Sequence, residues 1–440
     1  MDYRYGREEM RRIFSEEARL QRLLDVEAAL ARAHASVGNI PKEDADAISK
    51  AARIDVVTLR SVKEMEEKTR HDIAALVRVL SEKSGDSGRY VHLGATSSDI
   101  LDTATALQVK ETVNILIQNL RGLKNVFVDM AKKHKGTVML GRTHGLAAVP
   151  MTFGLKMAVY AAEVNRHVRR LNETLPRICV GKMMGAVGTG AALGEKAITI
   201  QDRVMEDLGL GVEEASTQIV GRDRYVELIS DLAGIASSME KFATEVRNLQ
   251  RTEIAEVEES FGTAQIGSST MAQKRNPITS ENICGLARIV RGYVHPAFEN
   301  VPLWHERDLT NSSAERFIIP HACILTDDII AKTTDVFRNL TVNEDRMMEN
   351  IERTKGQVMV EAVMTALVEK GMDRQKAYEL VRVCAATARE KDVHLLDVLL
   401  EDGEVKRHLN EKELKEVMDP ADYLGASKEI VDRIVSALRD

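Results

Sequence analysis

The sequence predicts an all-α protein organised around a bundle of long helices. Three long segments contain no proline, namely those between Pro41 and Pro150, between Pro176 and Pro277, and between Pro320 and Pro420. Such segments permit very long helices, because a proline inside a helix costs about 3 kcal/mol. Strand-like alternation is scarce, and aromatic residues make up only 4% of the 440 residues. Both observations favour helices over sheets.

Two of these segments carry apolar residues at alternating steps of four and three. They are Val109, Val113, Leu116, Leu120, Leu123, Phe127 and Met130 in the first, and Leu228, Leu232, Ile235, Met239, Phe242, Val246 and Leu249 in the second. This spacing is typical of the buried seam of a helix bundle. A third stretch, residues 153–171, keeps the spacing but includes His167, for which we expect a structural role at a partly open seam position. Long helices with more than one apolar stripe bury them only with other chains, so we expect an oligomer.

Three domains are predicted along the chain. Residues 1–95 are expected to form short helices, of which the first covers residues 16–35. Residues 96–341 hold the long-helix bundle. Residues 342–440 are rich in Lys and Glu with helical periodicity, which indicates a separate, smaller helical domain.

Composition narrows the class of protein. A hydrophobic fraction of 44% and a charged fraction of 29% indicate a soluble globular protein, and the net charge of −7 argues against a nucleic-acid partner. The four cysteines are scattered singly, which argues against disulfides and a zinc site and favours a reducing cytoplasm. The first residues do not form a signal peptide, and no apolar run approaches a membrane span.

Two polar groups in the first domain have no function that their local sequence reveals. Arg4 and Tyr5 precede the first helix, where an isolated Arg-Tyr pair indicates a disordered terminus. Residues 69–72, Thr-Arg-His-Asp, bring a cation, an imidazole and a carboxylate together. Most clusters of this kind are solvated helix surface.

The stretch of residues 90–103 precedes the first long helix, and we expect Ser98 or Asp99 to cap that helix. Capping does not require His92, Thr96 or Ser97, which makes these three residues candidates for an anion site at the helix N-terminus.

His144 follows the turn-forming sequence Leu140-Gly-Arg-Thr. The ordinary pKa of histidine suits proton transfer near neutral pH, although a lone histidine is more often structural.

Residues 267–277 read Gly-Ser-Ser-Thr-Met-Ala-Gln-Lys-Arg-Asn-Pro. Asn276 is expected to cap a following helix, with Pro277 as its first residue. This predicts an anion site, because free N–H groups and the helix dipole favour negative charge there. A mobile surface loop with solvated cations fits these eleven residues equally well.

Two further polar features stand out. Gln218 is explained by neither packing nor capping. Residues 304–316 gather charges and hydroxyls around the only tryptophan, which favours a site or an interface.

Residues 267–277 resemble the signature loop G-S-S-x-M-P-x-K-x-N-P of the fumarase/aspartase superfamily, with Ala272 in place of the family's proline. Over essentially the whole chain, the motifs are most similar to the adenylosuccinate lyase branch. They are Arg4-Tyr5, residues 69–72, Tyr90 to Ser97, Gly141 to Gly145, Thr217-Gln218, Arg222 to Arg224, residues 304–308 and Ser312 to Arg316.

The resemblance implies a C–N lyase that releases fumarate by β-elimination, from adenylosuccinate to give AMP and from the succinyl-aminoimidazole carboxamide ribotide (SAICAR) to give AICAR. It implies that His144 is the general acid and Ser268 the general base, with Ser269 a close rival. Lys274 and Asn276 would stabilise the dianion that forms, and Glu281 would orient the histidine network.

The resemblance also implies substrate-binding residues. The nucleotide and its phosphate would be held by Arg4, Tyr5, Arg307, Ser312 and Arg316, and the succinyl group or base by Arg70, His71, Asp72, Thr96, Ser97 and Gln218, with His92 and Ser269 nearby. No cofactor or metal is implied, and no membrane or nucleic-acid partner. Family members are cytoplasmic enzymes of purine biosynthesis, and their homotetramers build each active site from three subunits.

Three departures and two alternatives accompany this interpretation. Besides Ala272, residues 146–149 replace a histidine and an acid of many relatives, and Met184 stands where serine is frequent. Ala272 should loosen the loop, but no predicted acid, base or charge clamp is lost. The alternatives are another fumarate-releasing lyase, such as argininosuccinate lyase, and a catalytically silent structural oligomer.

Overall fold

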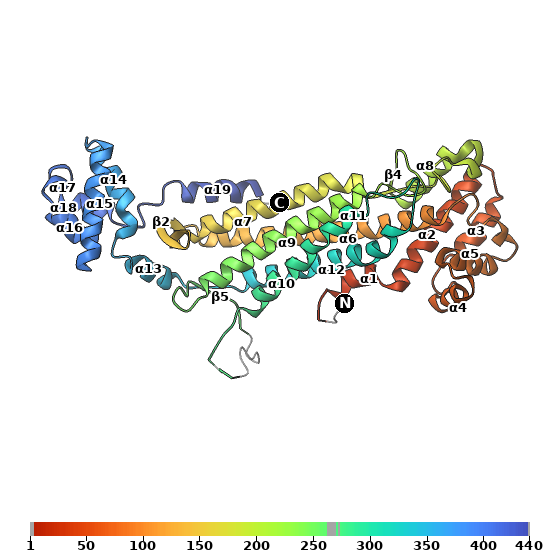
Figure 1. Cartoon of the computed structure of the whole chain (residues 1–440), viewed down its shortest axis with the longest axis horizontal. Coiled ribbons are helices and arrows are strands. Elements are labelled where there is room, and N and C mark those ends of the chain that lie inside the picture. The colour runs from red at the N-terminus through yellow and green to blue at the C-terminus, as the bar shows by residue number, and fades with distance from the viewer. Residues whose placement is uncertain (1–3, 262–269, 272, 439–440) are drawn as a thin grey trace. The chain divides into compact units, whose positions relative to one another are not determined.

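The computed structural model describes residues 4–261, 270–271 and 273–438, and they form a mainly helical chain, as predicted (Figure 1). The chain divides into two compact units. The first unit comprises Met1–Leu120, Arg166–Met239 and Gly285–Ala331. The second comprises Arg121–Asn165, Glu240–Cys284 and Lys332–Asp440. The division into three domains at residues 95 and 341 stays a prediction.

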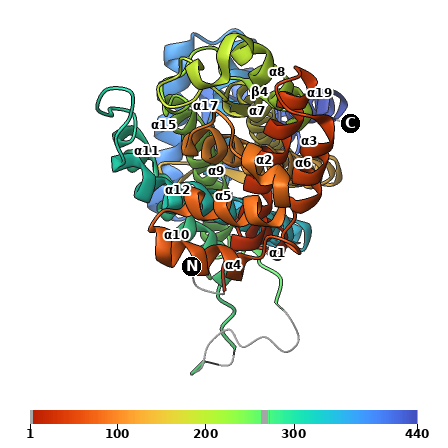
Figure 2. The ribbon, with the colours of Figure 1, turned by 90° about the vertical axis from the view of Figure 1, so that its right-hand side faces the viewer.

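The first unit opens with short helices, as predicted. They are α1 (Glu8–Ile13), α2 (Glu16–Ser36), α3 (Lys42–Ala51), α4 (Leu59–Thr69), α5 (Asp72–Lys83) and the 3-10 helix η1 (Gly85–Tyr90). The helix expected over residues 16–35 is α2, which begins where the Ser15 hydroxyl accepts a hydrogen bond from Ala18 N at 3.1 Å. In the view of Figure 2, helices α2 to α5 face the viewer and lie next to one another. Their shared core also includes residues from η2 (Ala191–Lys196) and α8 (Ala197–Leu208).

The predicted seams lie on three long helices, α6 (Ser97–Lys133), α7 (Phe153–Ile178) and α9 (Asp223–Leu249). A further long helix, α12 (Thr310–Arg338), carries no predicted seam. All seven seam residues on α9 are buried, and on α6 all but Met130, which is half-buried. His167 is also buried, and its Nε2 lies 2.8 Å from the Ser238 hydroxyl. Its role is therefore structural, but the seam is closed at this position rather than partly open.

Two shorter helices come before α12 in the chain, namely α10 (Ile278–Gly292) and α11 (Val294–Glu299). The next long helix is α12, which runs through Pro320. Ile318, Ile319 and Cys323 are at most 4% exposed, so burial around the proline offsets the backbone hydrogen bond that it removes.

An aromatic cluster lies in the core of the second unit. Phe127 of α6 packs edge-to-face against Phe337 of α12 at 4.8 Å between ring centroids, Phe242 of α9 at 5.2 Å and Tyr160 of α7 at 5.5 Å. Four helices thus share one ring, which fixes how their second-unit segments pack.

The C-terminal part of the second unit has its own apolar core. Its elements are α13 (Glu344–Glu352), η3 (Gln357–Met359), α14 (Val360–Glu369), α15 (Arg374–Lys391), α16 (Leu395–Glu401), α17 (Gly403–His408), α18 (Glu411–Val417) and α19 (Ser427–Leu438). No helix in the described ranges is apolar over a length that would cross a bilayer.

Within the described part of the chain, the few strands form three pairs. The largest is the antiparallel hairpin of β1 (Val138–Thr143) and β2 (Leu146–Thr152), in which Thr143 faces Leu146. The two-residue pairs are β3 (Val180–Gly181) with β4 (Gly211–Val212), and β5 (Val257–Glu258) with β6 (Thr341–Val342). The hairpin was not predicted from the sequence, because its turn is His-Gly rather than the usual Asn-Gly.

We predict that Phe127→Ala lowers the free energy of unfolding by about 3–5 kcal/mol, because it removes the ring that four helices share. Urea denaturation followed by circular dichroism measures this. Tyr378→Ala, at a residue that is 52% exposed, serves as the control and should change stability by less than about 0.5 kcal/mol. Equal losses for the two variants would contradict the central role of the cluster.

Candidate active-site residues

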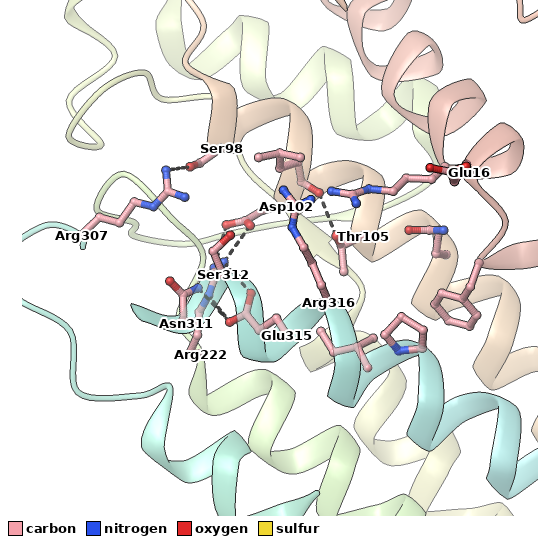
Figure 3. A pocket seen from close by; sticks show the side chains of 16 residues that line it. Glu16, Ser98, Asp102, Thr105, Arg222, Arg307, Asn311, Ser312, Glu315 and Arg316 are labelled. Atoms are coloured by element: carbon pink, nitrogen blue, oxygen red, sulfur yellow. Dashed lines mark hydrogen bonds and ion pairs between the residues drawn. The ribbon is translucent and has the colours of Figure 1, made fainter. Parts of the chain in front are cut away.

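A cavity of about 200 Å³ opens in the first unit between the start of α6, the start of α12 and the α1–α2 turn. Its lining includes the predicted residues Arg307, Ser312 and Arg316 (Figure 3). The remaining lining residues were not predicted: Phe14, Glu16, Arg19, Ser98, Leu101, Asp102, Thr105, Gln108, Arg222, Asn311, Glu315, Ile319 and Pro320. Four of the sixteen side chains are arginines, which suits an anionic ligand.

Arg307 joins three segments at the cavity. Its Nη1 donates to the Ser98 hydroxyl at 2.8 Å and to Gln218 Oε1 at 3.0 Å, and Figure 3 shows the first of these contacts. Gln218 in turn donates to the Ala186 carbonyl at 3.0 Å, which explains the polar residue that packing and capping left unexplained. Arg307 Nε is buried and has no hydrogen-bond partner, so the cavity retains one unsatisfied cationic donor.

Arg222, which directly precedes α9, forms a buried charge network with one carboxylate on α6 and one on α12. Arg222 donates to both oxygens of Asp102, at 2.8 and 2.9 Å, and to Glu315 Oε1 at 3.0 Å. Burial raises the pKa of Glu315, and Arg222 opposes this. Because Arg222 is neutralised twice, Arg19, Arg307 and Arg316 supply the cationic character of the cavity.

Arg316 connects the cavity to the predicted cluster of residues 69–72. Its Nη2 donates to Asp72 Oδ2 at 3.0 Å. Arg70 and His71 are exposed at the junction of α4 and α5, where His71 Nδ1 accepts from Ala74 N at 3.3 Å. Of this cluster, only Asp72 is tied to the cavity.

Two buried acids, Asp99 and Glu27, hold the residues that precede α6. The helix begins at Ser97, so Thr96 is its N-cap, and Asp99 accepts from Thr96 N at 2.7 Å. Asp99 also accepts from Met184 N and Gly185 N, at 3.1 and 3.0 Å, and pairs with the fully buried Lys182. The cap was therefore predicted too late in the chain: Asp99 lies in the first turn of the helix, where it accepts from the N-cap N–H and also anchors the glycine-rich loop. Ser98 does not cap but binds Arg307.

His92 is held by Glu27 of α2. Its Nδ1 lies 2.7 Å from Glu27 Oε1, and the Glu27 side chain is fully buried. Burial alone would lower the pKa of His92, but the carboxylates of Glu27 and Asp99 together outweigh burial and the pKa is raised. His92 also has a left-handed backbone, with φ of +62°, a strained conformation that is often found at functional sites.

His144 occupies the tip of the β1–β2 hairpin, in the second unit. His144 and Gly145 have φ values of +54° and +78°, as a type I′ turn requires. Arg142, two residues before the tip, donates to both oxygens of the buried Glu256, at 2.9 and 2.6 Å. Asn350 also donates to Glu256, at 2.8 Å. The Arg142–Glu256 ion pair thus fixes the strands of the hairpin, while His144 at its tip is exposed.

The predicted cap of α10 was wrong by one residue. The helix begins at Ile278, so Pro277 precedes it, and the cap is the Glu259 carboxylate. Glu259 accepts from Thr279 N at 2.9 Å and from Ser280 N at 3.0 Å. A carboxylate therefore already occupies the donors on which the predicted anion site depended.

The remaining predicted residues can be placed individually. Lys274 and Glu281 are exposed, and Asn276 is half-buried. Arg4 is exposed and Tyr5 is half-buried, and neither lines the cavity. Ser268, Ser269 and Ala272 lie outside the described residues.

The two units divide the predicted residues between them. Among those described, the predicted substrate-binding residues all belong to the first unit, and His144, Lys274, Asn276 and Glu281 to the second. Ser98, Asp102 and Thr105 of the cavity were missed, although they extend the α6 seam towards its N-terminus by steps of four and three. Polar residues at positions that continue an apolar seam were the sequence signal that could have indicated this cavity.

The chain is similar to known proteins over its whole length. A family model described as Lyase matches residues 1–292, and one described as Adenylosuccinate lyase C-terminus matches residues 356–434. Adenylosuccinate lyases of Pyrococcus horikoshii and Methanocaldococcus jannaschii are 50% and 48% identical to it, covering all of this chain and 98% and 96% of theirs. The crystal structure of 3-carboxy-cis,cis-muconate lactonizing enzyme from Pseudomonas putida is similar with a TM-score of 0.91 at 35% identity, covering 99% of this chain and 97% of that one.

We predict that Glu27→Gln lowers the pKa of His92, because burial remains while the carboxylate that raises the pKa is lost. The ion pair stabilises the fold fully below the unfolded-state pKa of about 6.5, and this contribution disappears as pH rises through the raised folded-state pKa. The variant should therefore lose most stability at acidic pH. NMR titration of ¹³C-labelled histidine measures the pKa, with His134 as the internal control. An unchanged His92 pKa would contradict the pairing.

Proposed function

The chain belongs to the adenylosuccinate lyase family and is a fumarate-releasing C–N lyase, and we propose that one site serves both adenylosuccinate and SAICAR. The observation that carries this proposal is the arginine-rich cavity of the first unit, beside the full-length similarity. Both substrates share a ribose phosphate and a succinyl group, so one set of cationic and hydroxyl groups suits both.

The phosphate is the part of the substrate that best matches the cavity. Arg307 and Arg316 present guanidinium groups, and Ser312 adds a hydroxyl. Arginine binds phosphate through paired N–H donors, which gives both charge and orientation. The unsatisfied Nε of Arg307 supports a ligand at this position, because buried donors without partners are costly. Arg4 and Tyr5 are proposed to complete the phosphate site.

The elimination requires a base on carbon and an acid on nitrogen. Ser268 is proposed to remove a proton from the carbon next to a carboxylate, which creates an aci-carboxylate dianion. The C–N bond then breaks, its electron pair goes to nitrogen, and His144 donates the proton that nitrogen takes up. The products are fumarate and AMP, or fumarate and AICAR. The rigid hairpin tip supports this role for His144, since general acids act through fixed geometry.

Stabilisation of the dianion is proposed to come from side chains rather than from the α10 terminus. Glu259 already uses the N–H groups of Thr279 and Ser280, so the helix offers few free donors. Lys274 and Asn276 remain as the charge-stabilising groups, and Glu281 is proposed to orient the histidines. Arg70, His71, Asp72, His92, Thr96, Ser97, Gln218 and Ser269 are proposed to contact the succinyl group or base.

The assembly is proposed to be a homotetramer whose active sites are shared between subunits. Ile289, Phe298, Leu309 and Phe317 are large apolar residues of the first unit, each at least 50% exposed. Apolar groups exposed in this number support burial against other copies. The four cysteines are buried and free, which supports a location in the cytoplasm, where we place the enzyme in purine and AMP biosynthesis.

We expect fumarate release from adenylosuccinate and from SAICAR, followed as the ultraviolet absorbance change at each elimination. Argininosuccinate should give none, because it lacks the phosphate that the cavity is proposed to bind. The similar crystal structure is that of a 3-carboxy-cis,cis-muconate lactonizing enzyme, so 3-carboxy-cis,cis-muconate is also offered as a substrate. We expect that it is not lactonised. Fumarate from argininosuccinate alone would replace our proposal with the sister lyase, and turnover of none of these would favour a silent structural oligomer.

We predict that His144→Ala and Ser268→Ala each reduce kcat by at least about a hundredfold while the assembly stays intact, because each removes one proton-transfer group. Mixing the two inactive variants should restore part of the activity if sites are shared. Ser269→Ala is the matched variant that separates the rival serines. Near-normal rates in either single variant would disprove that residue's role, and no recovery after verified subunit exchange would disprove sharing.

A further inference from the structure

The segment that leads into α1 is fastened to α12 at two consecutive residues. Gly6 has φ of +89°, and a methyl group in place of its α-hydrogen would lie 2.3 Å from Ile324 Cγ2. Arg7 Nη1 donates to Asp327 Oδ1 at 3.2 Å. Ile324 and Asp327 are three residues apart on α12 and so share one face of the helix. Both contacts therefore hold the segment against the same surface.

Asp327 is a buried carboxylate with incomplete partners. Its side chain is fully buried, Asn119 of α6 donates to Oδ1 at 2.7 Å, and Oδ2 has no hydrogen-bond partner. Arg7 is the cation paired with it, and the other end of that guanidinium donates to the exposed Glu9 at 3.1 Å. The ion pair is thus buried on the α12 side and open to solvent on the α1 side.

We propose that Gly6, Arg7 and Asp327 form a clamp that positions Arg4 and Tyr5 for the substrate phosphate, which makes Asp327 a positioning residue. The inference rests on the binding role proposed above for Arg4 and Tyr5. These two residues precede the first helix, so no helix of their own orders their backbone. Because the clamp holds the residues that follow them, Arg4 and Tyr5 are already ordered in the folded protein. Substrate binding then loses less conformational entropy, which increases the affinity for the substrate.

The clamp also gives substrate binding a pH dependence. Burial raises the pKa of Asp327 to about 6, Arg7 and Asn119 oppose this, and Glu9 and Asp328 add to it. Cys323 also lies near Asp327, and burial raises the pKa of its thiol, so it stays neutral here. As pH falls through this range, Asp327 takes up a proton and Arg7 loses its anionic partner. KM should then rise.

The test is Asp327→Asn, with kcat and KM measured for adenylosuccinate between pH 5 and pH 8. We expect KM at pH 7.5 to rise about five- to tenfold, as for the loss of one charge-assisted hydrogen bond, with kcat within about twofold. Below pH 6.5 the KM of the variant should rise less steeply than that of the wild type. The substrate phosphate also titrates near pH 6, but it does so for both enzymes, so their difference isolates Asp327.

Thermal unfolding separates positioning from a structural role. A carboxylate with a raised pKa stabilises the fold below its unfolded-state pKa and loses that contribution as pH rises through the folded value. At pH 7.5 the charged form of Asp327 therefore lowers the free energy of unfolding, and Asp327→Asn should keep or raise the melting temperature. A KM increase that comes with a large drop in melting temperature would overturn the proposal, as would an unchanged KM.

Matched variants complete the design. Glu9→Gln changes the exposed partner of Arg7 and should leave KM within about twofold, because exposed ion pairs contribute little. Arg7→Gln should raise KM as Asp327→Asn does, and Arg7→Lys should restore much of the loss. Gly6→Ala should raise KM through a clash that involves no charge, so its effect should not depend on pH.

Arg4→Ala separates the proposed phosphate role of Arg4 from the proposed clamp of Gly6, Arg7 and Asp327. If Arg4→Ala leaves KM unchanged, the proposed phosphate role of Arg4 is wrong, and the clamp has nothing to position. If Arg4→Ala raises KM while Asp327→Asn and Gly6→Ala do not, the phosphate role survives and the clamp is overturned.

Discussion

The buried network of Arg222, Asp102 and Glu315 is the interaction on which the first unit's cavity depends. It joins the residue that directly precedes α9 to α6 and α12 through four charge-assisted hydrogen bonds of 2.8 to 3.3 Å. Removing one partner from such a network leaves a buried charge uncompensated, which typically costs about 3–5 kcal/mol. The network therefore fixes the helices that present Ser98, Ser312 and Arg316, while its own charges stay neutralised. Arg19, Arg307 and Arg316 are the lining arginines outside this network.

Buried acids organise the rest of the candidate site in a similar way. Asp99 accepts from Thr96 N at the start of α6 and holds the glycine-rich loop through Met184 N and Gly185 N. Glu259 caps α10, Glu256 fixes Arg142 below the hairpin, and Glu27 holds His92. In each case an acid occupies donors that could otherwise bind an anionic ligand. Under the proposed function, arginine, lysine and amide side chains stabilise the charge of the substrate.

Much of the fold could be predicted because it follows from local spacing. The apolar steps of four and three on α6 and α9 mark positions that are buried, and α2 begins and ends within a residue of its predicted range. The hairpin, the full length of α12 and the cap of α10 were missed or misplaced. Each depends on contacts between residues distant in sequence, such as Arg142 with Glu256 or Glu259 with Ser280. Local propensity carries no information about them.

The sequence by itself determined the helical class, the seams, the family and the residue types that the chemistry requires, because these follow from periodicity and from contiguous motifs. Only the tertiary structure decided which polar residues work together. It showed that Ser98 serves Arg307 rather than the helix cap, that Arg222 is neutralised by Asp102 and Glu315, and that Arg7 reaches Asp327. The physical reason is that a buried charge selects its partner by position in space, and the chain brings residues up to 320 positions apart within hydrogen-bond distance.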